Sequence, residues 1–340
     1  MATTLADVAA HAGVSVQTVS NALNNPGLLK RGTLTRVLSA VDELGYSPNI
    51  QARRLRQRTV STIGLRIEPI ADNIASSLLD RFLHELTAQA DALGQHVVLF
   101  TATSDAEEVQ KIDALARGRI ADRFLLTSTH PDDARVPALL EIGMPFVTFG
   151  RPWGTSPEHS WVDVDGAVGT RQATRMLQDT WHRRIGFLGW PAGSGSGDDR
   201  RRGWAEAMME RTALGERELE ALTARSVDGV AAAVEAVPPL LASGIDALVC
   251  ASDSLATGAI AALSQAGTRM PVIGFDNTSL AAGLGFPSVD QSLGAVAAAA
   301  LAALDDGAAV STTLVAPRLV RRDDPRWGIG PAADRGTPPS

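Results

Sequence analysis

Uncharged polar residues recur near the N-terminus at a spacing that would place them on one side of a helix. They are Gln17, Thr18, Ser20, Asn21 and Asn24. Amide and hydroxyl side chains form hydrogen bonds that match the donors and acceptors of base edges in a DNA major groove, and Val16 beside them could contact a thymine methyl. The same residues could instead form a solvated surface, so the elements that carry them must decide between the two interpretations.

Two short helical patterns meet at Gly13 and would carry these side chains. Thr4 can cap the first helix, Asp7 suits its first turn, and Gly13 can end it in a left-handed conformation. Ser15 can cap the second helix, whose apolar face is Val19, Ala22 and Leu23. A third amphipathic helix is expected over residues 33–44, with an inward face of Leu34, Val37, Leu38, Val41 and Leu44. This plan predicts a helix–turn–helix whose second helix enters a DNA major groove.

A short basic segment follows Pro48. It contains Ala52, Arg53 and one large apolar residue, Leu55. Residues 1–60 carry seven basic and three acidic residues, a net charge of +4, whereas the remainder carries 24 basic and 35 acidic residues, a net charge of −11. A basic head on an acidic body is expected if only the head contacts DNA phosphates. A solubility feature is the alternative, which the placement of these charges on patterned helices disfavours.

Length and composition indicate a cytoplasmic protein of two or three domains. The 340 residues exceed one ordinary core, and 45% hydrophobic with 20% charged residues is typical of soluble globular proteins. The single cysteine, Cys250, fits a reducing compartment. No signal-peptide pattern is present, and the longest apolar run, residues 295–304, is too short to cross a membrane.

From residue 61 onward, short apolar strands alternate with longer helical patterns. Strands are expected at residues 62–67, 96–100, 123–127, 146–150, 184–190, 247–251 and 272–275. Helices are expected at residues 74–93, 106–117, 168–179, 203–211, 229–243 and 255–266. This alternation predicts two α/β units with parallel sheets, one before about residue 160 and one after it. Because such sheets bind ligands at the carboxyl ends of their strands, a cleft is expected between the units.

Several motifs occur together in the head: T-L-A-D-V-A-x-x-A-G-V-S from Thr4, Q-T-V-S from Gln17, L-G-Y-x-P-N from Leu44 and A-R-x-L-R from Ala52. This combination resembles the lactose-repressor (LacI/GalR) family of bacterial transcription regulators. Further family blocks lie at residues 162–166, 182–189, 200–204, 251–256 and 273–277. The resemblance implies an all-α helix–turn–helix head with a hinge helix, followed by an α/β two-lobed domain like the periplasmic binding proteins, with two parallel sheets.

The resemblance assigns DNA-contacting roles to residues of the head. Base edges would be read by Val16, Gln17 and Asn21. Phosphates would be held by Thr4, Ser15, Thr18, Ser20, Asn24, Thr33 and Arg53. Leu55, with Ala52, would wedge into the central minor-groove step and kink the duplex. A disordered basic linker is the alternative for this last segment.

The resemblance also assigns an effector site in the body. It places Arg200, Asp276 and Ser252 at this site. Three further candidates are Arg151, just beyond an expected strand, with a surface arginine as the alternative, Gln291, near the crossover back to the first lobe, and Trp161 as a stacking ring. Arg200, in the family's R-x-x-G-W motif, and Asp276, after a strand, would bond the hydroxyls of a sugar or polyol. The alternatives are a solvated loop arginine for Arg200 and a structural cap for Asp276.

Two departures from the family pattern concern aromatic residues. No aromatic residue lies between Trp204 and Phe275, so a sugar ring must stack elsewhere, for which the candidates are Trp153, Trp161 and Trp190. Trp181 stands where the family usually has glycine, which puts the local turn in doubt.

The expected domains are a helix–turn–helix at residues 1–48, a hinge at 49–60, a two-lobed domain at 61–326 and a disordered tail at 327–340. Lobe 1 is expected at about 61–160 plus 292–318, and lobe 2 at about 161–291 plus 319–326. We expect a homodimeric repressor that binds a palindromic operator in double-stranded DNA under control of a sugar effector. A nucleoside or purine effector, an activator, and a sugar-binding protein without DNA binding are the alternatives. No motif indicates catalysis, a metal or a cofactor.

Overall fold

The chain forms two separate units, residues 1–60 and residues 61–340. The computed structural model describes residues 4–24, 29–44, 61–67, 75–153, 158–306 and 310–322, and the side chains of residues 23–24 and 75–77 are not among those described. The expected hinge, with Ala52, Arg53 and Leu55, and the expected tail lie outside the described residues. Their assigned roles stay predictions.

The described part of the N-terminal unit contains three helices: α1 (Leu5–Ala12), α2 (Val16–Asn24) and α3 (Arg31–Glu43). Thr4 and Asp7 form a reciprocal capping box at the start of α1, and Gly13 ends α1 with φ 62°. Val8, Val19 and Val37, one from each helix, are fully buried in the core. The capping predictions and the helix–turn–helix plan are confirmed.

The inward position expected for Leu38 is wrong, because its side chain is 43% exposed. Leu38 lies about 100° around α3 from the buried Val37, at the edge of the apolar face rather than within it. Helix α3 also begins at Arg31, so Thr33 lies in its first turn, half-buried, instead of at its start.

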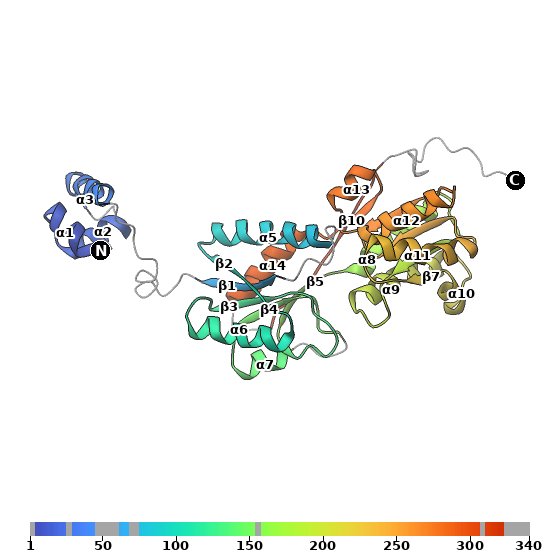
Figure 1. The fold of residues 1–340 in the computed structure, drawn as a ribbon, viewed down its shortest axis with the longest axis horizontal. Helices are drawn as coiled ribbons and strands as arrows, with labels where there is room; N and C mark the ends of the chain where they lie inside the picture. The colour runs from blue at the N-terminus through green and yellow to red at the C-terminus, as the bar shows by residue number, and fades with distance from the viewer. Residues whose placement is uncertain are drawn as a thin grey trace. The chain divides into compact units, whose positions relative to one another are not determined.

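The first lobe is a six-stranded parallel sheet in the order β11-β5-β4-β3-β1-β2. Its strands are β1 (Thr62–Ile67), β2 (His96–Thr101), β3 (Arg123–Leu126), β4 (Phe146–Phe149), β5 (Ser160–Val164) and β11 (Thr312–Val315). Its helices are α5 (Ala75–Ala92), α6 (Asp105–Arg117), α7 (Arg135–Glu141) and α14 (Leu293–Asp306). Figure 1 shows α5 and α14 along one face of the sheet and α6 and α7 along the other.

The second lobe is a six-stranded sheet in the order β12-β10-β9-β8-β6-β7, parallel except where β12 pairs with β10. Its strands are β6 (Ile185–Gly189), β7 (Thr223–Arg225), β8 (Ala247–Cys250), β9 (Val272–Phe275), β10 (Ser288–Asp290) and β12 (Arg318–Val320). Its helices are α8 (Gly166–Asp179), α9 (Ser196–Arg211), α10 (Glu216–Ala221), α11 (Val230–Ala242), α12 (Asp253–Gln265) and α13 (Ser279–Leu284).

The chain passes between the lobes three times: after β5, after β10 and between β11 and β12. The first crossing therefore lies after Val164, and not near residue 160 as the sequence predicted. Residues 160–164 pair with β4 and β11, and Val162 and Val164 are buried. The alternation of these valines with Trp161 and Asp163 made the segment unlike the other, continuously apolar strands.

Helix α9 begins seven residues before the expected position, because residues 196–202 are helical despite their glycine, serine and charge. Arg200 is thus a helical residue and does not lie at the end of an exposed loop. Among the residues that the structure describes, no helix is long and apolar enough to cross a membrane.

Candidate effector site and nucleic-acid interface

Helix α2 presents the expected base-reading residues at its surface. Val16 is 41% exposed, Gln17 is exposed and Asn21 is half-buried. The Gln17 amide nitrogen donates to the Asn21 side-chain oxygen at 3.3 Å, as residues one helical turn apart can. The two amides thus lie together on the exposed face, the arrangement that base reading needs.

The hydroxyls expected at phosphates already have local partners. The Thr4 hydroxyl donates to the Asp7 carboxylate at 2.7 Å, and Ser15 accepts the Thr18 backbone N–H at 3.2 Å while bonding its hydroxyl at 2.9 Å. These contacts shape the ends of α1 and α2, so a phosphate would have to share these hydroxyls. The phosphate roles of all seven residues stay predictions.

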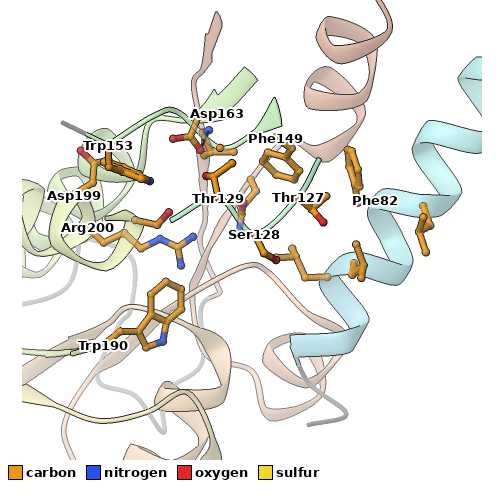
Figure 2. Close-up of a pocket in the computed structure, with 18 of the residues that line it drawn as sticks. Phe82, Thr127, Ser128, Thr129, Phe149, Trp153, Asp163, Trp190, Asp199 and Arg200 are labelled. Atoms are coloured by element: carbon orange, nitrogen blue, oxygen red, sulfur yellow. Dashed lines mark hydrogen bonds between the residues drawn. The ribbon is translucent and has the colours of Figure 1, made fainter. Parts of the chain in front are cut away.

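A cavity of about 570 Å³ lies between the two lobes. Its lining from the first lobe includes an apolar group, namely Ile67, Leu78, Leu79, Phe82, Leu83 and Phe149. The other side is polar and aromatic, with Trp153, Asp163, Trp190, Ser196, Asp199, Arg200 and Gln291. Figure 2 shows Arg200 and Trp190 across the cavity from Phe82 on α5. The cavity is therefore amphipathic, with one apolar wall and one wall of hydrogen-bonding groups.

Arg200 is the charged centre of the polar wall. Its guanidinium lies 3.7 Å from the centroid of the Phe275 ring and 4.9 Å from that of Trp190, and it donates to the Ala251 carbonyl. Only 7% of the residue is exposed, and burial lowers the pKa of the guanidinium, although the nearby Asp276 opposes this change. Ring stacking and the bond to Ala251 hold the Arg200 guanidinium in place, and Arg200 lines the cavity, so it can bind a ligand there.

Asp276 lies behind Arg200 at the end of β9. Its carboxylate is 3.7 Å from the Arg200 guanidinium and accepts the Gln291 amide at 2.6 Å. Burial raises the pKa of Asp276 to about 8, and the Arg200 charge works against this rise. Its backbone φ is 110°, a strained value for a residue with a Cβ. Arg200 and Gln291 line the cavity, whereas Asp276 does not line it and contacts both of them from behind. Its role in binding an effector stays a prediction.

The R-x-x-G-W motif has a steric cause in the packing of α8 against α9. A Cβ at Gly203 would lie 2.0 Å from the Ala167 carbonyl oxygen, so only glycine allows this approach. The next residue, Trp204, is fully buried and donates its indole N–H to the Ile185 carbonyl at 3.1 Å. These two residues set the position of α9 and thereby aim Arg200, one turn earlier, into the cavity.

The glycines at the start of α9, Gly195 just before the helix and Gly197 in its first turn, lie against two tryptophan rings. A Cβ at Gly195 would lie 2.6 Å from the Trp153 ring, and one at Gly197 would lie 3.2 Å from the Trp190 ring. Trp153 belongs to the first lobe and Gly195 to the second, so the ring bridges the cleft. Of the three tryptophans expected as stacking candidates, Trp153 and Trp190 line this cavity and Trp161 does not.

Arg151 has a different place from the one expected. Its guanidinium bonds the Asp163 carboxylate at 2.6 Å and the Val164 carbonyl at 3.0 Å, and it lies 3.4 Å from Asp199 of the second lobe. Arg151 does not line the cavity, but it balances the charge of two acids that do. Asp163 and Asp199 were missed because strand β5, which carries Asp163, and the helix turn that carries Asp199 were not predicted.

Ser252 and Trp161 also lie away from the cavity lining. Ser252 is fully buried, caps α12 by accepting the Leu255 N–H at 3.1 Å, and bonds Asp228. This is a structural role at the N-terminus of a helix. Trp161 pairs within the sheet with Thr148 and Thr312.

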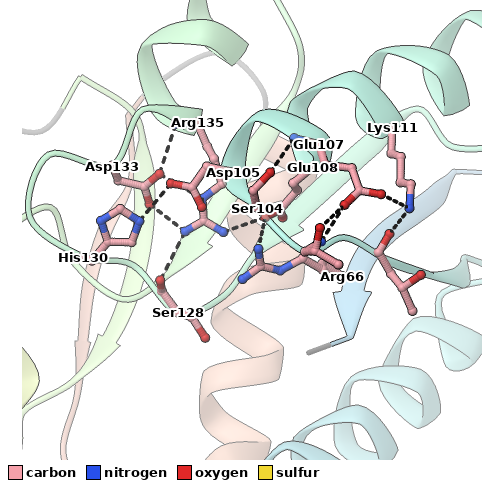
Figure 3. Close-up of polar contacts among 12 residues, drawn as sticks. Arg66, Ser104, Asp105, Glu107, Glu108, Lys111, Ser128, His130, Asp133 and Arg135 are labelled. Carbon is pink, nitrogen blue, oxygen red and sulfur yellow. Dashed lines mark hydrogen bonds and ion pairs between the residues drawn. The ribbon is translucent and has the colours of Figure 1, made fainter. Parts of the chain in front are cut away.

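A buried ion network supports the part of the cavity wall formed by Thr127, Ser128 and Thr129 of the first lobe. Arg135, with no exposed surface, bonds Asp133 at 2.6 and 2.8 Å, Glu108 at 2.9 Å and the Ser128 carbonyl at 3.3 Å, as Figure 3 shows. Arg66 pairs with the same Glu108 at 2.9 Å. Burial raises the pKa of Glu108 although both arginines oppose this. Ser128 has φ 54°, so Arg135 supports a strained residue at the cavity.

Asp105, His130 and Asp133 beside this network have ligand atoms within 4.8 Å of one another. Both Asp133 oxygens already accept from Arg135, and the two His130 nitrogens contact Asp105 and the Pro131 carbonyl. The adjacent guanidinium would repel a cation, so this cluster is better explained as a loop support than as a metal site.

Comparison with known proteins bears on both the head and the body. A family model described as bacterial regulatory proteins, lacI family, matches residues 4–49, and a periplasmic binding protein-like domain matches residues 156–323. The HTH-type transcriptional regulator CelR of Thermobifida fusca is 34% identical over 289 residues, which cover 82% of this chain and 83% of CelR. This chain belongs to the lacI family of bacterial regulatory proteins. The family resemblance seen in the sequence is confirmed.

Further relatives support this LacI-family assignment over most of the chain. The regulator GalS of Salmonella typhimurium is 32% identical over 346 residues, covering 95% of this chain and 97% of GalS. A CelR–cellobiose complex is 29% identical, with a TM-score of 0.68 over 94% of this chain and 99% of that chain. The Lac repressor dimer bound to operator and an anti-inducer has a TM-score of 0.79 over 95% and 98% of the two chains. At 22% identity that last match shows the fold alone.

The LacI-family chain is therefore a DNA-binding transcription regulator with a helix–turn–helix head and a two-sheet α/β body. The predicted fold class is confirmed. The curated relatives are transcription regulators and not enzymes.

Proposed function

We propose that this regulator is a repressor of transcription whose operator affinity is controlled by a sugar or related polyol in the cavity between the lobes. One observation carries the proposal: buried polar atoms at the cavity have no hydrogen-bond partner among the described residues. They are Thr127 Oγ1, Trp153 Nε1, Trp190 Nε1 and Arg200 Nε. Because unpaired buried donors are costly, a ligand rich in oxygen acceptors would stabilise this arrangement.

A sugar matches the rest of the cavity as well. Its hydroxyls suit Arg200, Gln291 and the carboxylates, and its C–H faces suit the indole rings of Trp153 and Trp190. The apolar wall on α5 would take the less polar edge of the ring or a glycosidic substituent. The complex of CelR with cellobiose makes β-linked glucose disaccharides the first ligands to test.

Titration calorimetry of the full chain against cellobiose, maltose, lactose, galactose, glucose and guanosine would test the effector class. We expect micromolar binding by at least one sugar, and Arg200→Gln should remove its heat while leaving operator affinity unchanged. Arg175→Gln, on an exposed ion pair with Glu210, is the matched control. Binding of guanosine with no sugar response would replace the sugar proposal by the nucleoside alternative.

For the DNA, we propose that Gln17 and Asn21 read base edges and that two heads bind a palindrome as a homodimer. Sequencing of genomic DNA enriched by the purified protein would give the operator. Gln17→Ala should then weaken operator binding by about 1–3 kcal/mol and relax preference at one position. An unchanged base preference in both Gln17→Ala and Asn21→Ala would remove these residues from the reading surface.

The homodimer proposal is supported by the edge strand β2, where Leu99 is 47% exposed, and by Leu93 just before it, at 59%. Strands of a parallel sheet are normally covered, so this edge suits a partner. Sedimentation of the full chain should show a dimer, and a monomer at operator-binding concentrations would contradict it. A DNA-binding regulator acts where the chromosome is, so we propose a cytoplasmic location and no catalytic role.

A further inference from the structure

One arginine of α5 reaches across the cleft to the backbone of the proposed effector site. The Arg81 guanidinium donates to the Asp276 carbonyl at 3.1 Å and to the Asn277 carbonyl at 2.9 Å, and lies 3.4 Å from the Asp290 carboxylate. Arg81 belongs to the first lobe, whereas its three partners belong to the second. These contacts therefore join the lobes at the residue that supports Arg200.

The turn that Arg81 holds has an unusual backbone. Asp276 has φ 110° and Asn277 has φ 50°, both in the region that glycine normally occupies. Consecutive residues with a Cβ adopt such values only where their surroundings impose them. The two carbonyls that Arg81 binds are those of the two strained residues, so its guanidinium is one of the contacts that impose the conformation.

Other contacts of the turn come from within the second lobe. The Asp276 N–H donates to the Val289 carbonyl at 2.7 Å, and the Asn277 side chain donates to Asp290 at 2.7 Å. Arg322 donates to the Asn277 side-chain oxygen at 2.6 Å. Among these contacts of the turn, only those of Arg81 depend on how the two lobes are set relative to one another.

Helix α5 also forms the apolar wall of the cavity. The residues on either side of Arg81, Asp80 and Phe82, both line it, together with Leu78 and Leu79. A ligand in the cavity would therefore contact the same helix that holds the Asp276 turn. Any shift of α5 relative to the second lobe would change the ligand's apolar wall and the support of Asp276 at once.

We infer that Arg81 is a positioning residue that fixes the Asp276–Asn277 turn from the opposite lobe and so makes effector affinity depend on the setting of the lobes. The inference rests on the proposed function for its ligand, but the hold of Arg81 on the turn is independent of any ligand. The relative position of the lobes that keeps the Arg81 contacts should therefore bind the effector more tightly, and the bound effector should favour that position in turn.

Hydrogen–deuterium exchange of the ligand-free full chain tests the hold on the turn. Arg81→Met removes the guanidinium and keeps the apolar stem, so the amides of Asp276 and Asn277, bonded to Val289 and Ser288, should exchange about tenfold faster. Arg175→Met is the matched control, because the Arg175 side chain is 45% exposed against 40% for Arg81 and its ion-pair partner, Glu210, lies in its own lobe. Unchanged exchange at the turn in Arg81→Met would overturn the inference.

Cellobiose calorimetry on the same variants tests the consequence for binding. Arg81→Met should weaken cellobiose affinity by about tenfold, equivalent to about 1.4 kcal/mol. Arg81→Lys keeps one cationic donor and should recover part of both the affinity and the exchange protection. If Arg81 only stabilised the fold, its substitution would change neither the cellobiose affinity nor the exchange at the turn. Faster exchange with unchanged affinity would overturn the positioning role. If the parent protein binds no sugar, the sugar proposal fails, and the exchange experiment alone decides whether Arg81 holds the turn.

Discussion

The raised pKa of Asp276 predicts that effector binding depends on pH. In the ligand-free protein this carboxyl is half-protonated at about pH 8, because burial outweighs the attraction of Arg200. Asp276 does not line the cavity itself, but its carboxylate contacts Arg200 and Gln291, which do. If effector hydroxyls reach this carboxylate, as the family resemblance implies, the ligand favours the ionised form and lowers its pKa. Binding should then release a proton at neutral pH, and affinity should fall as the pH drops below 8.

The size of the effect follows from the same value. If the bound carboxyl returns to its ordinary range, affinity falls about tenfold per pH unit below 8, or about 100-fold between pH 9 and pH 6. This corresponds to about 2.7 kcal/mol of binding free energy. The effect on folding has the opposite sign. Because the folded pKa is above the unfolded value of 3.8, the contribution of this carboxyl to stability is complete below pH 3.8 and is lost as pH rises through about 8.

Calorimetry at pH 6, 7, 8 and 9, with the best sugar from the panel, measures the affinity. Two buffers of different ionisation enthalpy at pH 7 measure the proton release. Asp276→Asn keeps the shape of the side chain but cannot ionise, so it should bind weakly with a flat pH profile. The buried His159 and the loop residue His130 do not line the cavity, and both remain in the Asn variant. Equal affinity at pH 6 and pH 9 without proton release in the parent protein would refute the reasoning.

Three further substitutions probe the framework of the site. Trp181 is 62% exposed and has φ 71°, a left-handed conformation that glycine adopts without strain. Trp181→Gly should therefore raise the free energy of unfolding by about 1 kcal/mol in urea titrations. A loss of stability would show that the ring contributes packing. Gly203→Ala should push α8 from α9, destabilise the fold by about 1–3 kcal/mol and weaken effector binding, whereas wild-type stability would contradict the 2.0 Å approach. Arg135→Met leaves Asp133 without its main partner and Glu108 with Arg66 alone. The free energy of unfolding should therefore fall by about 3 kcal/mol at pH 7, and by less at pH 4, where the carboxylates gain protons. An equal loss at both pH values would argue against a charge effect.

Local chemistry in the sequence was sufficient for the head. The capping residues Thr4 and Ser15, the stop at Gly13 and the apolar spacing act within one or two helical turns, so their structural result can be predicted without the rest of the chain. The exception is Leu38, because the width of the buried face depends on how closely α1 and α2 approach α3. In the body, most strands and helices were predicted for the same local reasons.

The resemblance to a family, not periodicity, brought Arg200 and Asp276 together from distant segments, and Gln291 was added for its place near the crossover between the lobes. The structure places these three in one cluster. Arg151, expected for its place after a strand, Ser252 and Trp161 do not line the cavity, because a residue in or just after a strand can face the cavity, a helix terminus or the sheet itself. Only the packing of neighbouring elements decides which.

What the sequence alone determined is the order of the elements, the basic head, the helix–turn–helix and the family. What only the tertiary structure decided is how the lobes meet: the tryptophan pair around the glycine-rich loop, the strained turn at Asp276, and the reach of Arg81 across the cleft. The physical reason is that helix caps and strand periods are short-range properties of neighbouring residues. A cavity between lobes is instead set by side chains as far apart in the chain as Arg81 and Asp276, whose contact no local pattern encodes.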